Sequence, residues 1–369
     1  MKIEIQRLYL LNLLEKASTV SGSSAISPFL RSFLLEVEPY HDVGKGEDSR
    51  MFNVLRTDRV LGVVAHTDAF TVLEDKEPYR VLIHADKFLN LVRNLESESV
   101  VINVPDGYSV QIEADSFKAN WMAFDISQFP DLPRCLSTKD MLKIKSADFI
   151  KAVERVRYAS GKDSVQSNFK QVFFDESGCW AWDGFTYQQV DFETEKPFAI
   201  PLEAIDVVKF ARISGVEDMY VGVSPESLHF VVGLDIFVAQ NPNVKAPNTS
   251  VLDKLRKKSP GFFVVEVAQL RKLIKRIGIT SDNNRIAVDV RDKSVTVSGK
   301  DDLDNKSNES VPIKFEGDVA KLNRFSLNWE FLDKALTSIE SKTVKISVET
   351  SHIILEGEDS YGVLSMLKV

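Results

Sequence analysis

The side chains that most often perform catalysis or bind metals are sparse in this sequence. Five histidines are scattered along the chain, and none has the spacing to other ligands that a metal site requires. They are His41, His66, His84, His229 and His352. The two cysteines, Cys135 and Cys179, lie far apart and form no CxxC motif. The sequence therefore predicts no metal site and no disulfide framework, and it fits a reducing compartment.

Sequence motifs of enzymes that bind nucleotides or form covalent intermediates are also missing. There is no GxxxxGK[ST] phosphate loop, no GxGxxG after a strand and no GxSxG elbow. Asp183 beside Gly184 could suggest a catalytic carboxylate, but this pair is more typical of a turn or a strand end. An enzyme would need a tight cluster of acids or bases with perturbed pKa values. We therefore expect a non-catalytic protein that needs no cofactor.

Length and composition indicate a multidomain protein. The 369 residues, of which 44% are apolar, can form two or three domains with real cores. No apolar run approaches the roughly 20 residues of a membrane helix, and charges interrupt the start where a signal peptide would be apolar. We expect a soluble, unprocessed, cytoplasmic protein. Its net charge of -8 means that any contact with nucleic acid must be local.

A long internal repeat is the most informative feature of the sequence. A short apolar strand, a helix, and two alternating strands recur in this order three times. Ile83, Ile200 and Leu327 occupy equivalent strand ends, 117 and 127 residues apart. These separations are too long for solenoid repeats and suit whole domains.

Each repeat also opens with a matching strand and helix, at KIEIQRLYLLNLLEKAS, LKIKSADFIKAVERVRYAS and FFVVEVAQLRKLIKRIGI. In the second copy, Phe149, Val153 and Val156 share one helix face, which predicts a helix half buried on a sheet. The fold class is therefore α+β, with two helices packed on antiparallel sheet in each repeat. Segments rich in Pro and polar residues separate three expected domains, at residues 1–139, 140–259 and 260–369.

The helices are positive relative to the rest of the chain. The predicted helices sum to +4, which leaves -12 elsewhere, and most of the positive charge lies in the helix at 267–277. A basic run can be simply a solvated helix face. Three repeats with helices on one side would instead gather these charges on one curved surface.

Local matches along essentially the whole chain resemble the β subunit of bacterial DNA polymerase III, the sliding clamp. FDISQFPDLP is similar to the family's Phe-Pro signature, WAWDGFTYQQV to its Thr-Asp-Gly-His-Arg-Leu strand, and YGVLSMLKV to its C-terminal ending. RVRYASGKDSVQSNFKQVFFDES resembles the stretch after the second domain's first helix. The resemblance implies three domains of like fold in each chain, and two chains closed head to tail into a ring around duplex DNA, with the helices inside.

The resemblance also implies a pocket for short apolar peptides of DNA polymerase and clamp-loader subunits. Residue by residue, it carries over to Phe169, Trp182, Gly184, Phe185, Thr186, Tyr187, Pro247, Val251, Leu252, Val363, Leu364, Ser365, Met366 and Leu367. Phe185 and Thr186 replace His and Arg of the family pattern, so a bulkier, less polar pocket is expected. The alternative is that these apolar residues are ordinary core residues.

The DNA-facing residues expected from the helices and the resemblance are Lys151, Arg155, Lys162, Lys209, Arg212, Arg271, Lys272, Lys275 and Arg276. Ser24 falls where an arginine is common, which suggests a weaker grip on DNA. The resemblance places the dimer interface at Ala119, Trp121, Ile277 and Gly278. Trp121 could instead pack inside its own domain.

Two functions therefore remain open. The first is a sliding clamp, a processivity factor that encircles duplex DNA and tethers a polymerase and other replication or repair proteins. The alternative is a clamp-like scaffold or inhibitor that binds replication proteins without loading on DNA. Loading onto nicked circular DNA distinguishes them.

Overall fold

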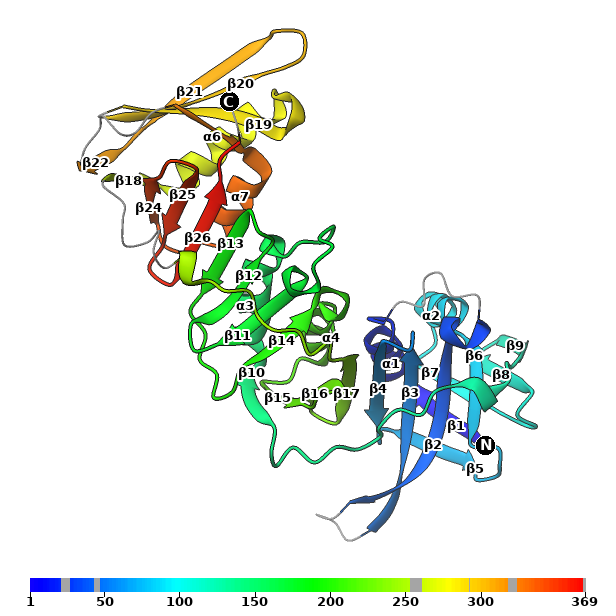
Figure 1. The fold of residues 1–369 in the computed structure, drawn as a ribbon. Helices are drawn as coiled ribbons and strands as arrows, with labels where there is room; N and C mark the ends of the chain where they lie inside the picture. Colours follow the sequence, from blue (N-terminus) through cyan, green and yellow to red (C-terminus); the bar gives the residue numbers. More distant parts are fainter. Residues whose placement is uncertain (21–26, 43–46, 253–260, 292, 318–323, 368–369) are drawn as a thin grey trace. The chain divides into compact units, whose positions relative to one another are not determined.

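The chain folds as an α+β protein with antiparallel sheets, as the sequence predicted (Figure 1). The computed structural model describes residues 1–20, 27–42, 47–252, 261–291, 293–317 and 324–367. The chain divides into two compact units. Unit 1 contains Met1–Ala147 and Glu203–Asn243, and unit 2 contains Asp148–Leu202 and Val244–Val369.

The α-helices of the described residues occur in pairs where the repeats predicted them. In α3, Phe149, Val153 and Val156 are buried while Lys151 and Glu154 are exposed, so this helix has the expected buried face. In the second repeat, a 3-10 turn at Leu202–Ala204 precedes the second helix, α4, which begins at Val207. The helices are α1 Arg7–Ala17, α2 Ala85–Asn94, α3 Ser146–Val156, α4 Val207–Ser214, α6 Val267–Ile279 and α7 Trp329–Thr337.

Unit 1 has a five-stranded sheet, in the order β5-β1-β7-β8-β9, and an eight-stranded sheet, β10-β15-β16-β17-β4-β3-β2-β6. The strands of the first are β1 Lys2–Gln6, β5 Phe70–Glu74, β7 Ser99–Asn103, β8 Ser109–Ala114 and β9 Phe117–Met122. Those of the second are β2 Ser32–Asp42, β3 Glu47–Thr57, β4 Leu61–Thr67, β6 Arg80–His84, β10 Leu142–Lys145, β15 Asp218–Val223, β16 Ser227–Val232 and β17 Asp235–Gln240.

Unit 2 has a nine-stranded sheet, β14-β11-β12-β13-β26-β25-β24-β18-β22, and a four-stranded sheet, β21-β20-β19-β23. The first contains β11 Gln171–Asp175, β12 Gly178–Trp182, β13 Thr186–Val190, β14 Phe198–Pro201, β18 Gly261–Glu266, β22 Lys314–Gly317, β24 Thr343–Val348, β25 His352–Glu356 and β26 Ser360–Ser365. The second contains β19 Arg285–Arg291, β20 Ser294–Lys300, β21 Lys306–Pro312 and β23 Phe325–Asn328.

The two large sheets each join strands of consecutive repeats. In the first joint β4 pairs with β17, with Val64 opposite Ile236. In the second joint β13 pairs with β26, with Tyr187 opposite Val363. The middle repeat is therefore divided between the two units. Its strand β17 continues the sheet of the first repeat, and its strand β13 continues the sheet of the third repeat. The boundaries expected at 139/140 and 259/260 stay a prediction and do not coincide with the division into units.

A strap of residues 123–141 connects the first two repeats and crosses one face of the eight-stranded sheet. The Phe124 amide donates to the Leu82 carbonyl of β6 at 2.8 Å. Leu132 lies over Gly62 of β4, where a Cβ would approach its Cδ2 to 2.7 Å. Met141 lies over Gly222 of β15. The strap thus covers an apolar cluster that includes residues of both repeats.

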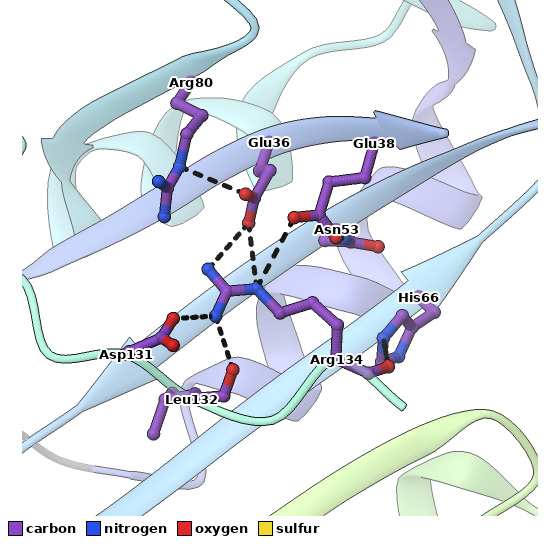
Figure 2. Close-up of polar contacts among 8 residues, drawn as sticks. All are labelled: Glu36, Glu38, Asn53, His66, Arg80, Asp131, Leu132 and Arg134. Carbon is purple, nitrogen blue, oxygen red and sulfur yellow. Dashed lines mark hydrogen bonds and ion pairs between the residues drawn. The ribbon is translucent and has the colours of Figure 1, made fainter. Parts of the chain in front are cut away.

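Arg134 fixes the strap to the sheet through the buried carboxylate of Glu36 (Figure 2). Its Nη2 lies 3.1 Å from Oε2 of Glu36, while Arg80 binds Oε1 of the same carboxylate at 3.0 Å. The Arg134 carbonyl accepts a hydrogen bond from Nε2 of His66 at 2.9 Å. Arg134 also contacts Asp131 within the strap. Backbone and side chain of this one arginine thus hold the strap.

This cluster predicts a pH-dependent stability of unit 1. Burial, and then the neighbouring Glu38, raise the pKa of Glu36 to about 7 against the attraction of the two arginines. The pKa of Glu36 in the folded protein is raised above the ordinary value of 4.5, so the fold favours the protonated form. The stability that protonated Glu36 contributes is complete below about pH 4.5 and is lost as the pH rises through about 7. Allowing for solvent screening, we expect a loss on the order of 1–2 kcal/mol.

Urea denaturation of the wild type and of Glu36→Gln at pH 5 and pH 8 measures this effect. The variant cannot ionise at this position, so its unfolding free energy should change less between the two pH values. A control, Glu113→Gln, alters a partly exposed carboxylate paired with Lys118 and should follow the wild type. Parallel pH profiles for the wild type and Glu36→Gln would show that Glu36 does not titrate in this range.

Candidate functional site

Aromatic side chains gather at one end of strands β12 and β13 in unit 2. The rings of Phe169 and Trp182 meet edge to face, with centroids 5.5 Å apart. Gly184 has φ +95°, and a Cβ there would lie 3.8 Å from the Phe169 ring. The next residue, Phe185, is 73% exposed. An exposed phenylalanine beside two half-buried aromatic rings offers an apolar surface for a partner.

Asp183 shapes the turn that presents Phe185. Its Oδ1 accepts hydrogen bonds from the amides of Phe185 and Thr186, at 2.8 and 2.6 Å. Burial raises the pKa of Asp183, and these two amide donors oppose that shift. The turn role that the sequence favoured for Asp183 is confirmed.

The C-terminal strand β26 brings a second group of predicted residues to this turn. The Ser365 amide donates to the Phe185 carbonyl at 2.9 Å, which extends the pairing of β13 with β26 to the turn itself. Met366 and Leu367 follow, held by the Ser351 and Ser326 carbonyls. The structure therefore brings the Phe185 turn together with Ser365, Met366 and Leu367, which we call the C-terminal lip.

The predicted peptide residues differ in their accessibility. Gly184, Phe185, Val251 and Leu367 are exposed, and Phe169, Trp182, Pro247, Ser365 and Met366 are half-buried. Thr186, Tyr187, Leu252, Val363 and Leu364 are buried, so for these five the alternative of core residues describes the structure better. Tyr187, Leu252 and Val363 share one apolar cluster, in which the Tyr361 hydroxyl donates to the Leu252 carbonyl at 3.2 Å. Trp182 of the site packs against this cluster.

Several of the predicted DNA-facing cations are already engaged within the chain. Arg155 binds both oxygens of Asp359, at 2.6 and 2.8 Å, and its side chain is only 10% exposed. Arg155 therefore belongs to a structural ion pair, and its expected exposure to DNA is wrong.

The basic helix α6 is partly neutralised by neighbouring acids. Arg271 and Lys275 share Asp333 of α7, at 2.9 and 3.4 Å, and Arg276 pairs with Glu309 of β21. Lys151 pairs with Glu340 at 2.6 Å. Four other predicted cations have exposed side chains: Lys162, Lys209, Arg212 and Lys272. Ser24 lies outside the described residues.

The residues expected at a dimer interface divide into two groups. Ala119 and Trp121 lie half-buried on β9, an edge strand, and the Trp121 ring packs on Phe88 with centroids 6.1 Å apart. Ile277 lies in the core of the third repeat and Gly278 is also buried, so they cannot offer the expected surface contact. A Cβ on Gly278 would lie 2.3 Å from the Trp329 ring. Ile279 is 78% exposed instead.

Two ion pairs between distant residues were not predicted from the sequence. Lys16 of α1 binds Asp235 of β17 at 2.6 Å, and both side chains are almost fully buried. Arg155 and Asp359 form the corresponding pair in unit 2. The partners are 219 and 204 residues apart, so no local pattern indicates them.

Other classes of site find little support. No group of three or more His, Cys, Asp or Glu side chains in the described part of the chain could hold a metal ion. Burial lowers the pKa of His66, His229 and His352. Within the same residues, no helix is long and apolar enough to cross a membrane.

Comparisons with known proteins agree with each other. Residues 1–133 match the family model of the DNA polymerase III beta subunit, N-terminal domain. A Beta sliding clamp from Vibrio cholerae is 18% identical over 365 residues, covering 95% of this chain and 94% of that protein. Another from Vibrio harveyi is 22% identical over 159 residues, covering 43% of this chain and 100% of that protein.

Solved structures share the fold over the whole chain. The beta subunit of the DNA polymerase of Streptococcus pyogenes has a TM-score of 0.86 at 16% identity, with 100% of both chains covered. The DNA polymerase III beta subunit of Thermotoga maritima has a TM-score of 0.84 at 18% identity, covering 100% of this chain and 99% of that one. A Pseudomonas aeruginosa sliding clamp bound to griselimycin has 0.84 at 18%, with full coverage of both.

Proposed function

We propose that this chain, which belongs to the DNA polymerase III beta subunit family, is a cytoplasmic sliding clamp that encircles duplex DNA and tethers a polymerase. It has no catalytic role of its own. The observation that carries this proposal is the way in which consecutive repeats join. Two joints are made within the chain, and the two strands that would make a third are left at sheet edges.

The correspondence of strands supports a ring. One strand has the same place in the sheet of each repeat: β4 in the first, β13 in the second and β21 in the third. The last strands of the three repeats, β9, β17 and β26, also correspond to one another. β4 pairs with β17 and β13 with β26, while β21 and β9 end their sheets.

A second copy can complete both open edges. If β21 of one copy pairs with β9 of the next, the contact is head-to-tail, and such contacts close into rings when the rotation allows. Pairing also satisfies edge groups that would otherwise favour aggregation. We propose the homodimer of the family, with Ala119 and Trp121 of one copy at the joint and Ile279 in place of the buried Ile277 on the other.

Contacts with DNA in such a ring need only be weak. Exposed cations such as Lys162, Lys209 and Arg212 would touch phosphates without reading sequence, while the acidic remainder of the surface limits tight binding. Topological linkage then keeps the protein on DNA. The experiment that tests this function asks whether protein loaded onto closed circles is released when the circle is cut. A protein that binds partner peptides but never loads would be the scaffold of the alternative.

We further propose that the apolar surface around Phe185 binds short peptides of polymerase and clamp-loader subunits. Half-buried Phe169, Trp182 and Met366 can receive aromatic and aliphatic anchors, and Phe185 can close over them. The absence of charge among these four side chains favours an apolar peptide.

The change Phe185→Asp should weaken the binding of a peptide with Leu and Phe anchors. A charge in this apolar site would have to be desolvated, so a loss of about 2 kcal/mol, roughly thirtyfold in Kd, is expected in fluorescence anisotropy. Phe185 is 73% exposed, so folding should be unaffected. The matched control is Leu303→Asp, at an 84% exposed loop position of the same unit. Equal affinities of Phe185→Asp and the control would remove the site assignment.

A further inference from the structure

The two joints within the chain are fixed by equivalent ion pairs. Lys16 and Arg155 are each the second-last residue of the first helix in their repeats. Lys16 binds Asp235 at the start of β17, and Arg155 binds Asp359 directly before β26. In both cases, a cation of one repeat reaches the start of the strand by which the next repeat joins it.

The third repeat carries the same cation without a following repeat. Buried residues at matching spacings align the helices: Leu10, Leu14 and Ala17 in α1 correspond to Phe149, Val153 and Val156 in α3 and to Leu270, Ile274 and Ile277 in α6. Arg276 therefore corresponds to Lys16 and Arg155. Its side chain is 58% exposed, and it binds Glu309 of β21, the strand at the open edge.

A second cation follows the same correspondence. Lys151 of α3 binds Glu340, which follows α7 of the next repeat, at 2.6 Å. In α6 its equivalent is Lys272, which is exposed.

A hydrogen bond that recurs in the first and third repeats identifies the residue of the first repeat that corresponds to Glu340. The Lys342 carbonyl accepts from the first amide of α6, and the Glu98 carbonyl accepts from the first amide of α1. Glu340 lies two residues before Lys342, so its equivalent is Glu96, which is also exposed. The third joint would therefore bring Lys272 of one copy close to Glu96 of the next.

We propose that Lys272 and Arg276 are cations of the joint between two copies of this chain, where Lys272 pairs with Glu96 of the second copy. Arg276 then faces the turn between β8 and β9 of that copy, where Asp115 is exposed. This inference rests on the proposed ring. It assigns to the joint two residues that the sequence had assigned to DNA, and it gives the joint a polarity, basic on the third repeat and acidic on the first.

Charge reversal at Lys272 and Glu96 tests the pairing. Sedimentation equilibrium without DNA would compare the wild type, Lys272→Glu, Glu96→Lys and the variant with both changes. Each single reversal places like charges together and should weaken self-association by about tenfold. The double variant restores opposite charges at each joint, so its Kd should return to within about threefold of the wild type. All positions are exposed, so folding should be unaffected.

The matched control is Lys209→Glu, which reverses an exposed cation on α4 outside the joint and should leave self-association unchanged. Single reversals without effect on a dimeric wild type, or a double variant as weak as the singles, would overturn the pairing and leave the ring intact. A wild type that stays monomeric at micromolar concentration would overturn the proposed ring together with this inference.

Discussion

Replacement of Lys16 by methionine should lower the unfolding free energy of the protein by about 3–5 kcal/mol, because it leaves a buried carboxylate without its cation. Asp235 is 7% exposed at its side chain, and within the described residues it would keep a hydrogen bond from the backbone amide of His66, at 2.8 Å, but no full positive charge to replace Lys16. A methionine of similar length preserves the packing of the side-chain stem. The loss therefore measures the uncompensated charge.

Urea denaturation measures the total loss, and hydrogen exchange locates it. Exchange of the β4 and β17 amides should accelerate most, because the pair lies at the joint between these strands. The control Lys151→Met removes a half-exposed cation from the pair with Glu340 and should cost at most about 1 kcal/mol.

A second variant separates the charge from the contact. Adding Asp235→Asn to Lys16→Met removes the orphaned charge while the amide oxygen can still accept from His66, so much of the stability should return. If Lys16→Met lowered the unfolding free energy no more than Lys151→Met, the Lys16–Asp235 pair would not stabilise the first joint as proposed.

The repeats were predictable because the spacing of apolar residues within a short segment indicates a helix or a strand. The spacing of Phe149, Val153 and Val156 predicted the buried face of α3, and the structure confirms it. The same periodicity places Ile277 on the buried face of α6, in line with Leu270 and Ile274. The sequence alone therefore held the signal that Ile277 belongs to the core, but the resemblance to clamps led to the opposite expectation.

The joints themselves could not be predicted, because they depend on contacts between distant residues. Arg155 was expected on a DNA-facing surface because of its position on the helix, yet it forms an ion pair with Asp359, 204 residues away. Arg134 lay in a segment that composition marked only as a linker, and the structure makes it the anchor of the strap on Glu36. Local patterns give the side-chain chemistry of such residues, and only the tertiary fold gives their partners.

The aromatic site was partly predictable for the same reason. Phe185 and Trp182 were expected at the pocket, and the structure places both at one turn with the C-terminal lip beside them. Tyr187 and Val363 were expected there too, but they lie opposite each other in the second joint and are buried. Position in sequence identified the right strands, while the pairing of the strands decided which side chains remain accessible.

We propose that the protein holds DNA by encircling it, and the lifetime of loaded protein on closed and on cut DNA tests this most directly. Labelled protein would be loaded onto nicked circular DNA with a clamp loader, freed of unbound protein, and followed before and after a restriction enzyme cuts the circle. A matched circle without the restriction site serves as the control. If the phosphate contacts are weak, as proposed, binding to linear fragments should fall steeply with salt while loaded circles persist. We predict a lifetime at least about tenfold longer on the closed circle than after cutting, whereas equal lifetimes on the two forms would contradict encirclement.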